Sequence, residues 1–168
     1  LRLGIHKEEL KSKLKLSNRE FNALFHLWRQ NRLFEELNSL VKLPGHAIIF
    51  NEKQQIQVAS LMQKFKDAPF SPPSAKECQE TVGEEIYYAL IQNGTLIQVS
   101  KEVIFRSGEF NEMVAMVRDH FKTHSSLTVV ELRDRLNTSR KYILAFLEYL
   151  DEIGITERKG DFRVLKPN

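Results

Sequence analysis

Apolar side chains recur along the chain in blocks that alternate between helical and extended spacing. The clearest block covers residues 140–153, where they stand three or four positions apart (Tyr142, Ile143, Phe146, Leu147 and Leu150). That spacing predicts an amphipathic helix, and Gly154 follows it as expected of a glycine that ends a helix. The short runs ITER and FRVL then flank KGD, which predicts a β-hairpin with a glycine-containing turn.

A shorter helix is predicted just before this block. Thr128 and Glu131 have the Thr-x-x-Glu spacing of a capping box, in which each side chain satisfies a backbone N–H of the other residue. Asn137 and Thr138 interrupt the apolar pattern. Thr138 and Ser139 are candidates for the N-cap of the second helix. The two helices are therefore expected to meet at a tight turn.

The middle of the chain repeats the second half of this plan. Residues 84–106 predict a helix, a glycine turn at Gly94, and two short strands. Gly94 and Gly154 stand 60 positions apart, and the apolar residues Ile86 and Leu90 have counterparts at the same offset. The middle segment is therefore predicted to be a second copy of the same unit.

The beginning of the chain follows the plan more loosely. Residues 6–14 predict a short helix, residues 17–34 a longer helix opened by the capping box of Ser17 and Glu20, and residues 33–44 a hairpin. Two further helical patterns lie between the units, at residues 51–68 and 108–124. No glycine- or serine-rich linker separates them, so tight joints are expected.

The repeated order is helix, helix, helix and β-hairpin, which is the order of a winged helix-turn-helix domain. The predicted fold class is mainly α with small β-hairpins (α+β), as tandem winged helix-turn-helix domains. We place them at residues 1–50, 51–106 and 107–168, with nucleic-acid binding in the last. The first unit lacks its opening helix, and the chain lacks an initiator Met, so a fragment of a longer protein is expected.

Composition and motifs argue against an enzyme or a membrane protein. No apolar run approaches the roughly 18 residues that span a bilayer, and no phosphate loop, HExxH or paired CxxC motif occurs. The single cysteine, Cys78, excludes an intrachain disulfide and is expected to be a buried apolar residue. His120 and His124 stand four positions apart, but no third ligand is suitably spaced for zinc. We therefore expect no catalytic residue, metal or cofactor in this chain.

The placement of basic residues is more informative than their number. The net charge is +3, and residues 1–50 carry nine basic and five acidic side chains, whereas residues 107–168 carry ten of each. Arg140 and Lys141 nevertheless lie in the first turn of a predicted helix, where the helix dipole disfavours cations. In a helix-turn-helix, that is the end that approaches nucleic acid. The pattern therefore favours an anionic partner at the start of this helix.

Other side chains leave more than one interpretation open. Arg158, Lys159 and Arg163 cluster around the predicted hairpin tip, where a wing would touch a second stretch of nucleic-acid backbone; each alone could be a solvated surface charge. Tyr142 could pack inward or contact the ligand. The basic residues near the N-terminus could contact nucleic acid without specificity, although a solvated helix face explains them as well (Lys7, Lys11, Lys13, Lys15 and Arg19).

Residues 127–165 resemble the last winged helix of the bacterial selenocysteine-specific translation elongation factor family, SelB. The resemblance lies in TSRKY, in the helix that follows, and in the pattern IG.T.R.GD.RVL; Phe146 stands where the family often has Leu. Residues 84–121 are similar to the preceding winged helix and its junction, and residues 1–50 match more weakly. The chain as a whole resembles the last three of the family's four C-terminal winged helices.

The resemblance implies binding to an mRNA hairpin, the selenocysteine-insertion (SECIS) element that marks a UGA codon for recoding. Carried over by position, the RNA contacts fall on seven residues (Ser139, Arg140, Lys141, Tyr142, Arg158, Lys159 and Arg163). GTP, selenocysteinyl-tRNA and the ribosome would be partners of the full-length factor. A monomer in the cytoplasm, without membrane contact, is implied. Glu84 and Glu85 stand where the last unit is basic, so the middle unit is expected to be a spacer.

Two other functions share the predicted fold. A DNA-binding transcription regulator would place the second helix in a major groove, usually as a symmetric dimer, which three unlike tandem units disfavour. A protein-interaction scaffold is the other alternative, because fold alone does not fix function.

Overall fold

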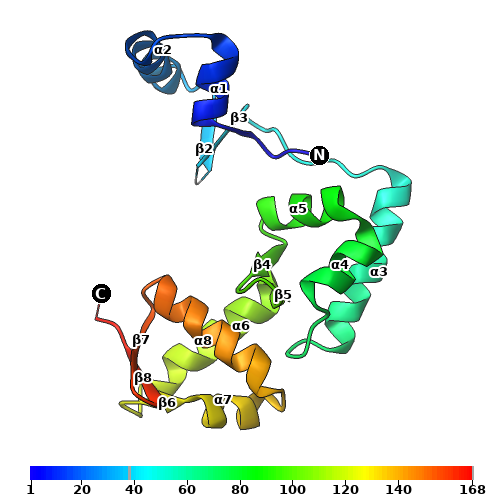
Figure 1. Ribbon diagram of the computed structural model, residues 1–168, viewed down its shortest axis with the longest axis vertical. Helices are drawn as coiled ribbons and strands as arrows, with labels where there is room; N and C mark the ends of the chain where they lie inside the picture. Colours follow the sequence, from blue (N-terminus) through cyan, green and yellow to red (C-terminus); the bar gives the residue numbers. More distant parts are fainter. Residues whose placement is uncertain (38, 168) are drawn as a thin grey trace. The chain divides into compact units, whose positions relative to one another are not determined.

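The computed structural model describes residues 1–37 and 39–167, and the chain folds as two compact units, Leu1–Phe50 and Asn51–Asn168. Figure 1 shows the helices and the small sheets of each unit. Most of the predicted elements are present, and their order confirms the predicted class of helices with small antiparallel sheets. In the described part of the chain, every helix is too short or too polar to cross a lipid bilayer.

The first unit consists of two helices and a three-stranded sheet. Its elements are β1 (Ile5–His6), α1 (Lys7–Leu14), α2 (Asn18–Gln30), β2 (Glu35–Leu37) and β3 (Leu40–Lys42), with the strands in the order β1-β3-β2. Ser17 caps α2 through the predicted capping box with Glu20. Phe21 and Phe25 of α2 pack with Val41 of β3 to form the buried core, so the apolar stripe of α2 faces the sheet.

An apolar pocket of about 330 Å³ lies in the first unit, lined by Ile5, Leu10, Trp28 and Leu33 among others. No helix precedes β1 in the described residues of this unit. In the second unit, the counterparts of Leu10 and Trp28 at an offset of 122 residues, Leu132 and Leu150, belong to the same apolar cluster as Met113 and Val117 of the helix Ser107–His120.

The second unit begins with three helices and a hairpin, here called the middle segment (residues 51–106). They are α3 (Glu52–Asp67), α4 (Ala75–Val82), α5 (Glu84–Gln92), β4 (Leu96–Gln98) and β5 (Ile104–Arg106). The C-terminal segment (residues 107–168) follows without a linker. It contains α6 (Ser107–His120), β6 (Leu127–Thr128), α7 (Val129–Leu136), α8 (Arg140–Glu152), β7 (Thr156–Lys159) and β8 (Phe162–Leu165).

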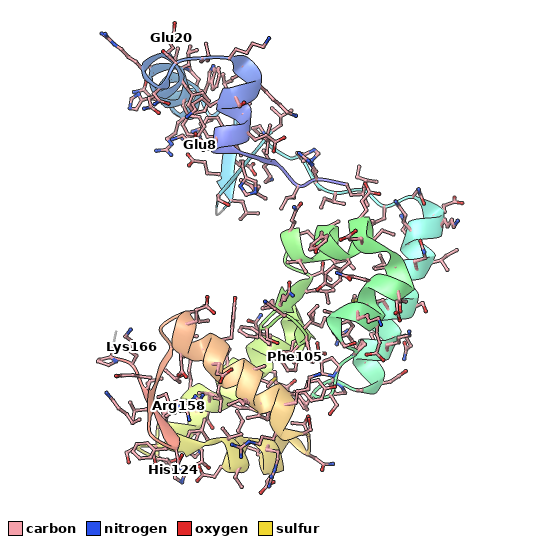
Figure 2. All side chains as sticks on the ribbon, viewed as in Figure 1. Glu8, Glu20, Phe105, His124, Arg158 and Lys166 are labelled. Carbon is pink, nitrogen blue, oxygen red and sulfur yellow. The ribbon has the colours of Figure 1, made fainter. Side chains whose placement is uncertain are left out.

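The middle and C-terminal segments share buried residues. Val99, Val103 and Phe105 of the middle segment belong to the same apolar cluster as Phe146 and Leu150 of α8. Figure 2 shows Phe105 between the two segments. The predicted domain boundary between residues 106 and 107 stays a prediction. The hairpin of β4 and β5, before this boundary, packs against the helices that follow it.

The first unit and the C-terminal segment share one strand register. Ile5 pairs with Val41 and Leu127 pairs with Arg163, so both partners recur 122 positions later. The pairs of the second hairpin follow the same offset, for example Glu36 with Val41 and Arg158 with Arg163. The repeat is therefore closer here than the loose sequence similarity suggested, and one segment can serve as an internal control for the other.

The short strands β1 and β6 were not predicted. Each has only two residues and becomes a strand by pairing with the last strand of its hairpin. The middle segment has a two-stranded sheet instead, and the backbone N–H of Ala75 donates to the carbonyl of Glu102 at 3.0 Å. Tertiary pairing, rather than local propensity, makes these strands.

Candidate nucleic-acid interface

The start of α8 is a helix end with little compensation for its positive dipole. Ser139 is the N-cap, but its side chain makes no capping hydrogen bond, and the first turn contains no acidic residue. The backbone N–H groups at a helix start lack intrahelical acceptors, and Arg140 and Lys141 add positive charge to them. The predicted helix start is confirmed, and its electrostatics favour an anion at this end.

Lys141 turns toward the middle segment. Its Nζ lies 2.8 Å from Oε2 of Glu102, in the turn between β4 and β5. The hydrogen bond between the two groups lowers the pKa of Glu102 and raises the pKa of Lys141. Both side chains are more than half exposed, so water screens the pair and it adds little to stability. The pair instead directs Lys141 away from the wing.

Tyr142 also faces the middle segment, as the inward-packing interpretation of this residue predicts; its contact with a ligand stays a prediction. Its hydroxyl donates to the carbonyl of Pro72 at 3.1 Å, and its ring contacts Phe105 edge-on at 6.5 Å between centroids. Thr138 contributes to the same joint through hydrogen bonds to the carbonyl of Phe70 and to the hydroxyl of Ser71. The turn before α8 is therefore held by the loop that joins α3 to α4.

Arg140 faces the opposite side and lines a pocket of about 250 Å³ between α7, α8 and the wing. Leu144, one helical turn further along α8, lines the same pocket, because residues four positions apart share a helix face. Arg158 and Arg163 complete the basic lining, with Asp161 as the one acidic residue among the lining side chains. The fold thus gathers three of the seven predicted residues around one pocket.

Arg158 and Arg163 are directly opposite each other on β7 and β8. Like charges at such positions destabilise a sheet. Arg158 is exposed and donates from Nε to the carbonyl of Gly160 at 2.9 Å. Bringing these two cations together destabilises the sheet, and an anionic ligand would offset this repulsion.

Arg163 lies in the interior, so its expected place at the surface of the hairpin tip is wrong. The residue is 1% exposed, and its Nε donates to Oδ2 of Asp151 at 3.0 Å. In the strand register, Arg163 lies opposite Leu127 of β6 on one side and opposite Arg158 of β7 on the other. Strand β8 is therefore the central strand of the sheet, and the helices cover its inward-facing positions. The unpredicted strand β6 is what makes β8 central.

Lys159 and Ser139 are near the pocket but do not line it. Lys159 is in the wing, where its Nζ lies 2.5 Å from Oε1 of Glu157. Ser139 is exposed beside Arg140. Their contacts with a ligand, like those of the other predicted residues, stay predictions.

Cys78 and the two histidines His120 and His124 are the candidates for a nucleophile or a metal site. Cys78 is fully buried, and burial raises the pKa of its thiol to about 12, which leaves it protonated and unreactive at neutral pH. The rings of His120 and His124 stack at 4.3 Å between centroids. Within residues 1–37 and 39–167, no three His, Cys, Asp or Glu side chains are placed to hold a metal ion.

Residues 119–165 match the family described as elongation factor SelB, winged helix. The chain is 28% identical over 133 residues to the selenocysteine-specific elongation factor of Desulfomicrobium baculatum, and 29% identical over 127 residues to that of Escherichia coli. These matches cover 76% and 74% of the chain. The chain resembles the C-terminal winged-helix region of SelB. This confirms the resemblance predicted from TSRKY and the wing.

Solved SelB structures agree with this resemblance. The mRNA-binding domain of E. coli SelB, in complex with SECIS RNA, is 27% identical, with a TM-score of 0.56; the match covers 70% of the chain and 100% of that domain. A bacterial selenocysteine-specific elongation factor, 21% identical with a TM-score of 0.56, shares the fold over 98% of the chain. The chain spans about a fifth of the length of the curated SelB relatives.

Several residues of the site were not predicted from the sequence. Glu102 and Pro72 hold the start of α8, and Asp151 binds Arg163. The burial of Arg163 was not predicted either, because it depends on the pairing of β8 with β6.

Proposed function

We propose that the chain binds an RNA hairpin and that the pocket between α8 and the wing holds its loop. The observation that carries the proposal is the convergence of Arg140, Arg158 and Arg163 on one pocket at an uncapped helix start. The likeness to the mRNA-binding domain of E. coli SelB supports RNA as the ligand. Unstacked loop bases can enter such a pocket, whereas those of a duplex cannot.

The first unit supports the assignment by contrast. At the offset of 122 residues, Asn18 stands in place of Arg140, Glu36 in place of Arg158, and Val41 in place of Arg163. The same backbone plan therefore occurs without any of the three cations. We propose that the first unit does not hold the hairpin loop, and that the middle segment is a spacer that positions α8.

The test measures binding of the full chain to three nucleic acids by gel shift. The first is an RNA hairpin selected by the chain from a pool with a randomised loop, the second is that hairpin with its loop sequence permuted, and the third is duplex DNA of the same sequence. We expect the selected hairpin to bind most tightly. Equal affinity for all three would overturn the proposal, and tightest binding to DNA would favour a transcription regulator.

We further propose that the chain is part of a selenocysteine-specific elongation factor and tethers it to a SECIS hairpin for UGA recoding. GTP, selenocysteinyl-tRNA and the ribosome would then be bound by the full-length factor, a cytoplasmic protein. The chain itself would act as a monomer without a cofactor or catalytic activity. Incubation of the isolated chain with GTP should yield no hydrolysis above buffer, and sedimentation should give a monomer with or without RNA.

A further inference from the structure

Asp151 connects the core of the C-terminal segment to the basic pocket. One carboxylate oxygen accepts from Nε of Arg163 at 3.0 Å, and the other accepts from the hydroxyl of Thr156 at 2.6 Å. The Arg163 side chain is 2% exposed and the Asp151 side chain 22% exposed. With both carboxylate oxygens engaged, Asp151 fixes the guanidinium group of Arg163 in one position.

The guanidinium group keeps an unused donor. Nη2 of Arg163 is buried and has no hydrogen-bond partner among the described residues. A buried donor without an acceptor costs about 1–3 kcal/mol, more when it is charged. Arg163 belongs to the lining of the pocket that Arg140 and Arg158 also line, so an acceptor would have to come from a ligand that enters this pocket and moves the covering side chains aside.

The fold does not require an ion pair at this position. In the first unit, Val41 occupies the place of Arg163, Arg29 that of Asp151, and Phe34 that of Thr156. Val41 is 7% exposed and packs on Phe21 and Phe25 with the same strand register. Since a buried ion pair often stabilises less than apolar residues of similar size, the pair in the C-terminal segment is better explained by ligand binding than by folding.

The pocket suits a base better than a phosphate alone. Val130 and Leu144 add apolar side chains to the arginines of the lining, and apolar side chains can pack against the face of a base. A fixed guanidinium group can donate to acceptor atoms on a base edge. Arg140 and Arg158 are exposed, so their long side chains can move aside when a ligand enters.

We propose that Asp151 is a positioning residue that holds Arg163 so that its unused Nη2 donates to an acceptor atom of an unpaired loop base. This proposal rests on the proposed binding of an RNA hairpin. It assigns loop discrimination to a pair of residues in the core, whereas the exposed cations of the site supply affinity for the phosphates.

The experiment compares the full chain with three variants, using the selected hairpin and its loop-permuted partner as probes. Asp151→Ala removes the anchor, and Arg163→Val installs the residue found at the equivalent place in the first unit. Glu152→Ala is the matched control, because Glu152 is the exposed neighbour of Asp151 in the last turn of α8. Thermal melting, the affinity ratio for the two hairpins, and the salt dependence of binding are measured for each.

We expect Asp151→Ala and Arg163→Val to lower the affinity ratio by about tenfold, the usual value of one good contact to a base edge. Affinity for the permuted hairpin and the salt dependence should stay unchanged, and Glu152→Ala should behave as the wild type. If Asp151→Ala fails to fold, Arg163→Val still decides whether Arg163 discriminates loops, and Asp151→Asn then tests the anchor.

Three results would overturn the proposal. In the first, Asp151→Ala keeps the wild-type affinity ratio for the two hairpins while Arg163→Val loses it. In the second, both variants keep the wild-type affinity ratio. Alternatively, Arg163→Val could weaken both hairpins equally and lower the salt dependence by about one phosphate contact, which would identify a phosphate ligand. A wild-type chain that does not discriminate between the hairpins would instead overturn the proposed function.

Discussion

Lys141 and Glu102 form an ion pair, with Nζ and Oε2 2.8 Å apart, between the first turn of α8 and the hairpin of the middle segment. In this pair, Glu102 binds Lys141, one of the cations that the resemblance assigns to RNA binding. Lys141 must therefore exchange a carboxylate for a phosphate if it contacts the ligand.

Glu102→Gln should raise the affinity for the RNA hairpin by about two- to fivefold, the range of an exposed ion pair. The reason is that Lys141 is freed and one negative charge is removed near the phosphates. The thermal midpoint should change little, since both side chains are exposed. Glu80→Gln is the control with the same charge change, because Glu80 pairs with Lys76 rather than with Lys141. Unchanged affinity in Glu102→Gln would show that Lys141 does not reach the RNA.

Arg140→Ala should weaken hairpin binding by about 1–3 kcal/mol, as expected for a base or specific phosphate contact. Its thermal midpoint should stay the same or rise slightly, because the change removes a cation from the positive end of the helix dipole. Arg118→Ala serves as a control with the same charge change on the exposed part of α6. Calorimetric titration and melting measure the two effects, and a loss of binding that merely follows unfolding would contradict the expectation.

Ser17→Ala and Ser139→Ala should differ in their effect on stability although the two serines are equivalent N-cap residues. Ser17 accepts a hydrogen bond from the backbone N–H of Glu20, so its loss should cost about 1 kcal/mol. Ser139 makes no such bond, so its loss should cost only a few tenths of that. Fluorescence of Trp28, the single tryptophan, reports unfolding of the first unit, and circular dichroism reports the loss of helix in both units, so a transition seen by circular dichroism but not by fluorescence belongs to the second unit. Equal costs in both variants would argue against the observed caps.

Glu109→Gln should destabilise the joint between β5 and α6 at neutral pH. Glu109 is 8% exposed and pairs with Arg106, and the hydrogen bond from Arg106 lowers the pKa of the Glu109 carboxyl. The loss should be about 2 kcal/mol, the value of a hydrogen bond to a charged group. Denaturant unfolding of the full chain measures it.

The same pair makes stability depend on pH in a defined direction. Because the folded-state pKa of Glu109 is depressed, its contribution is complete above the ordinary glutamate pKa and is lost as the pH falls through the lower folded value. The difference in unfolding free energy between wild type and Glu109→Gln should therefore shrink on acidification below that ordinary pKa. A difference that stays constant down to pH 2 would contradict this linkage.

Much of the fold was predictable because its signals are local. The helices follow from apolar spacing, and the boxes of Ser17 and Thr128 mark two of their starts. Gly154 ends α8 with a φ of 76°, a conformation that glycine adopts without steric cost. The strands β1 and β6 were missed because two residues carry no periodic signal; they exist only through pairing with distant strands.

The sequence by itself determined the order of the elements and the unfavourable placement of Arg140 and Lys141, since propensity, capping and the helix dipole act within a few residues. Only the tertiary structure decided the direction of each side chain. Helical rotation sends Arg140 to the pocket and Lys141 to Glu102, and the added strand β6 encloses Arg163 beside Asp151. Burial and pairing depend on residues far apart in the chain, and for that reason periodicity could locate the site without revealing how Arg163 is held in it.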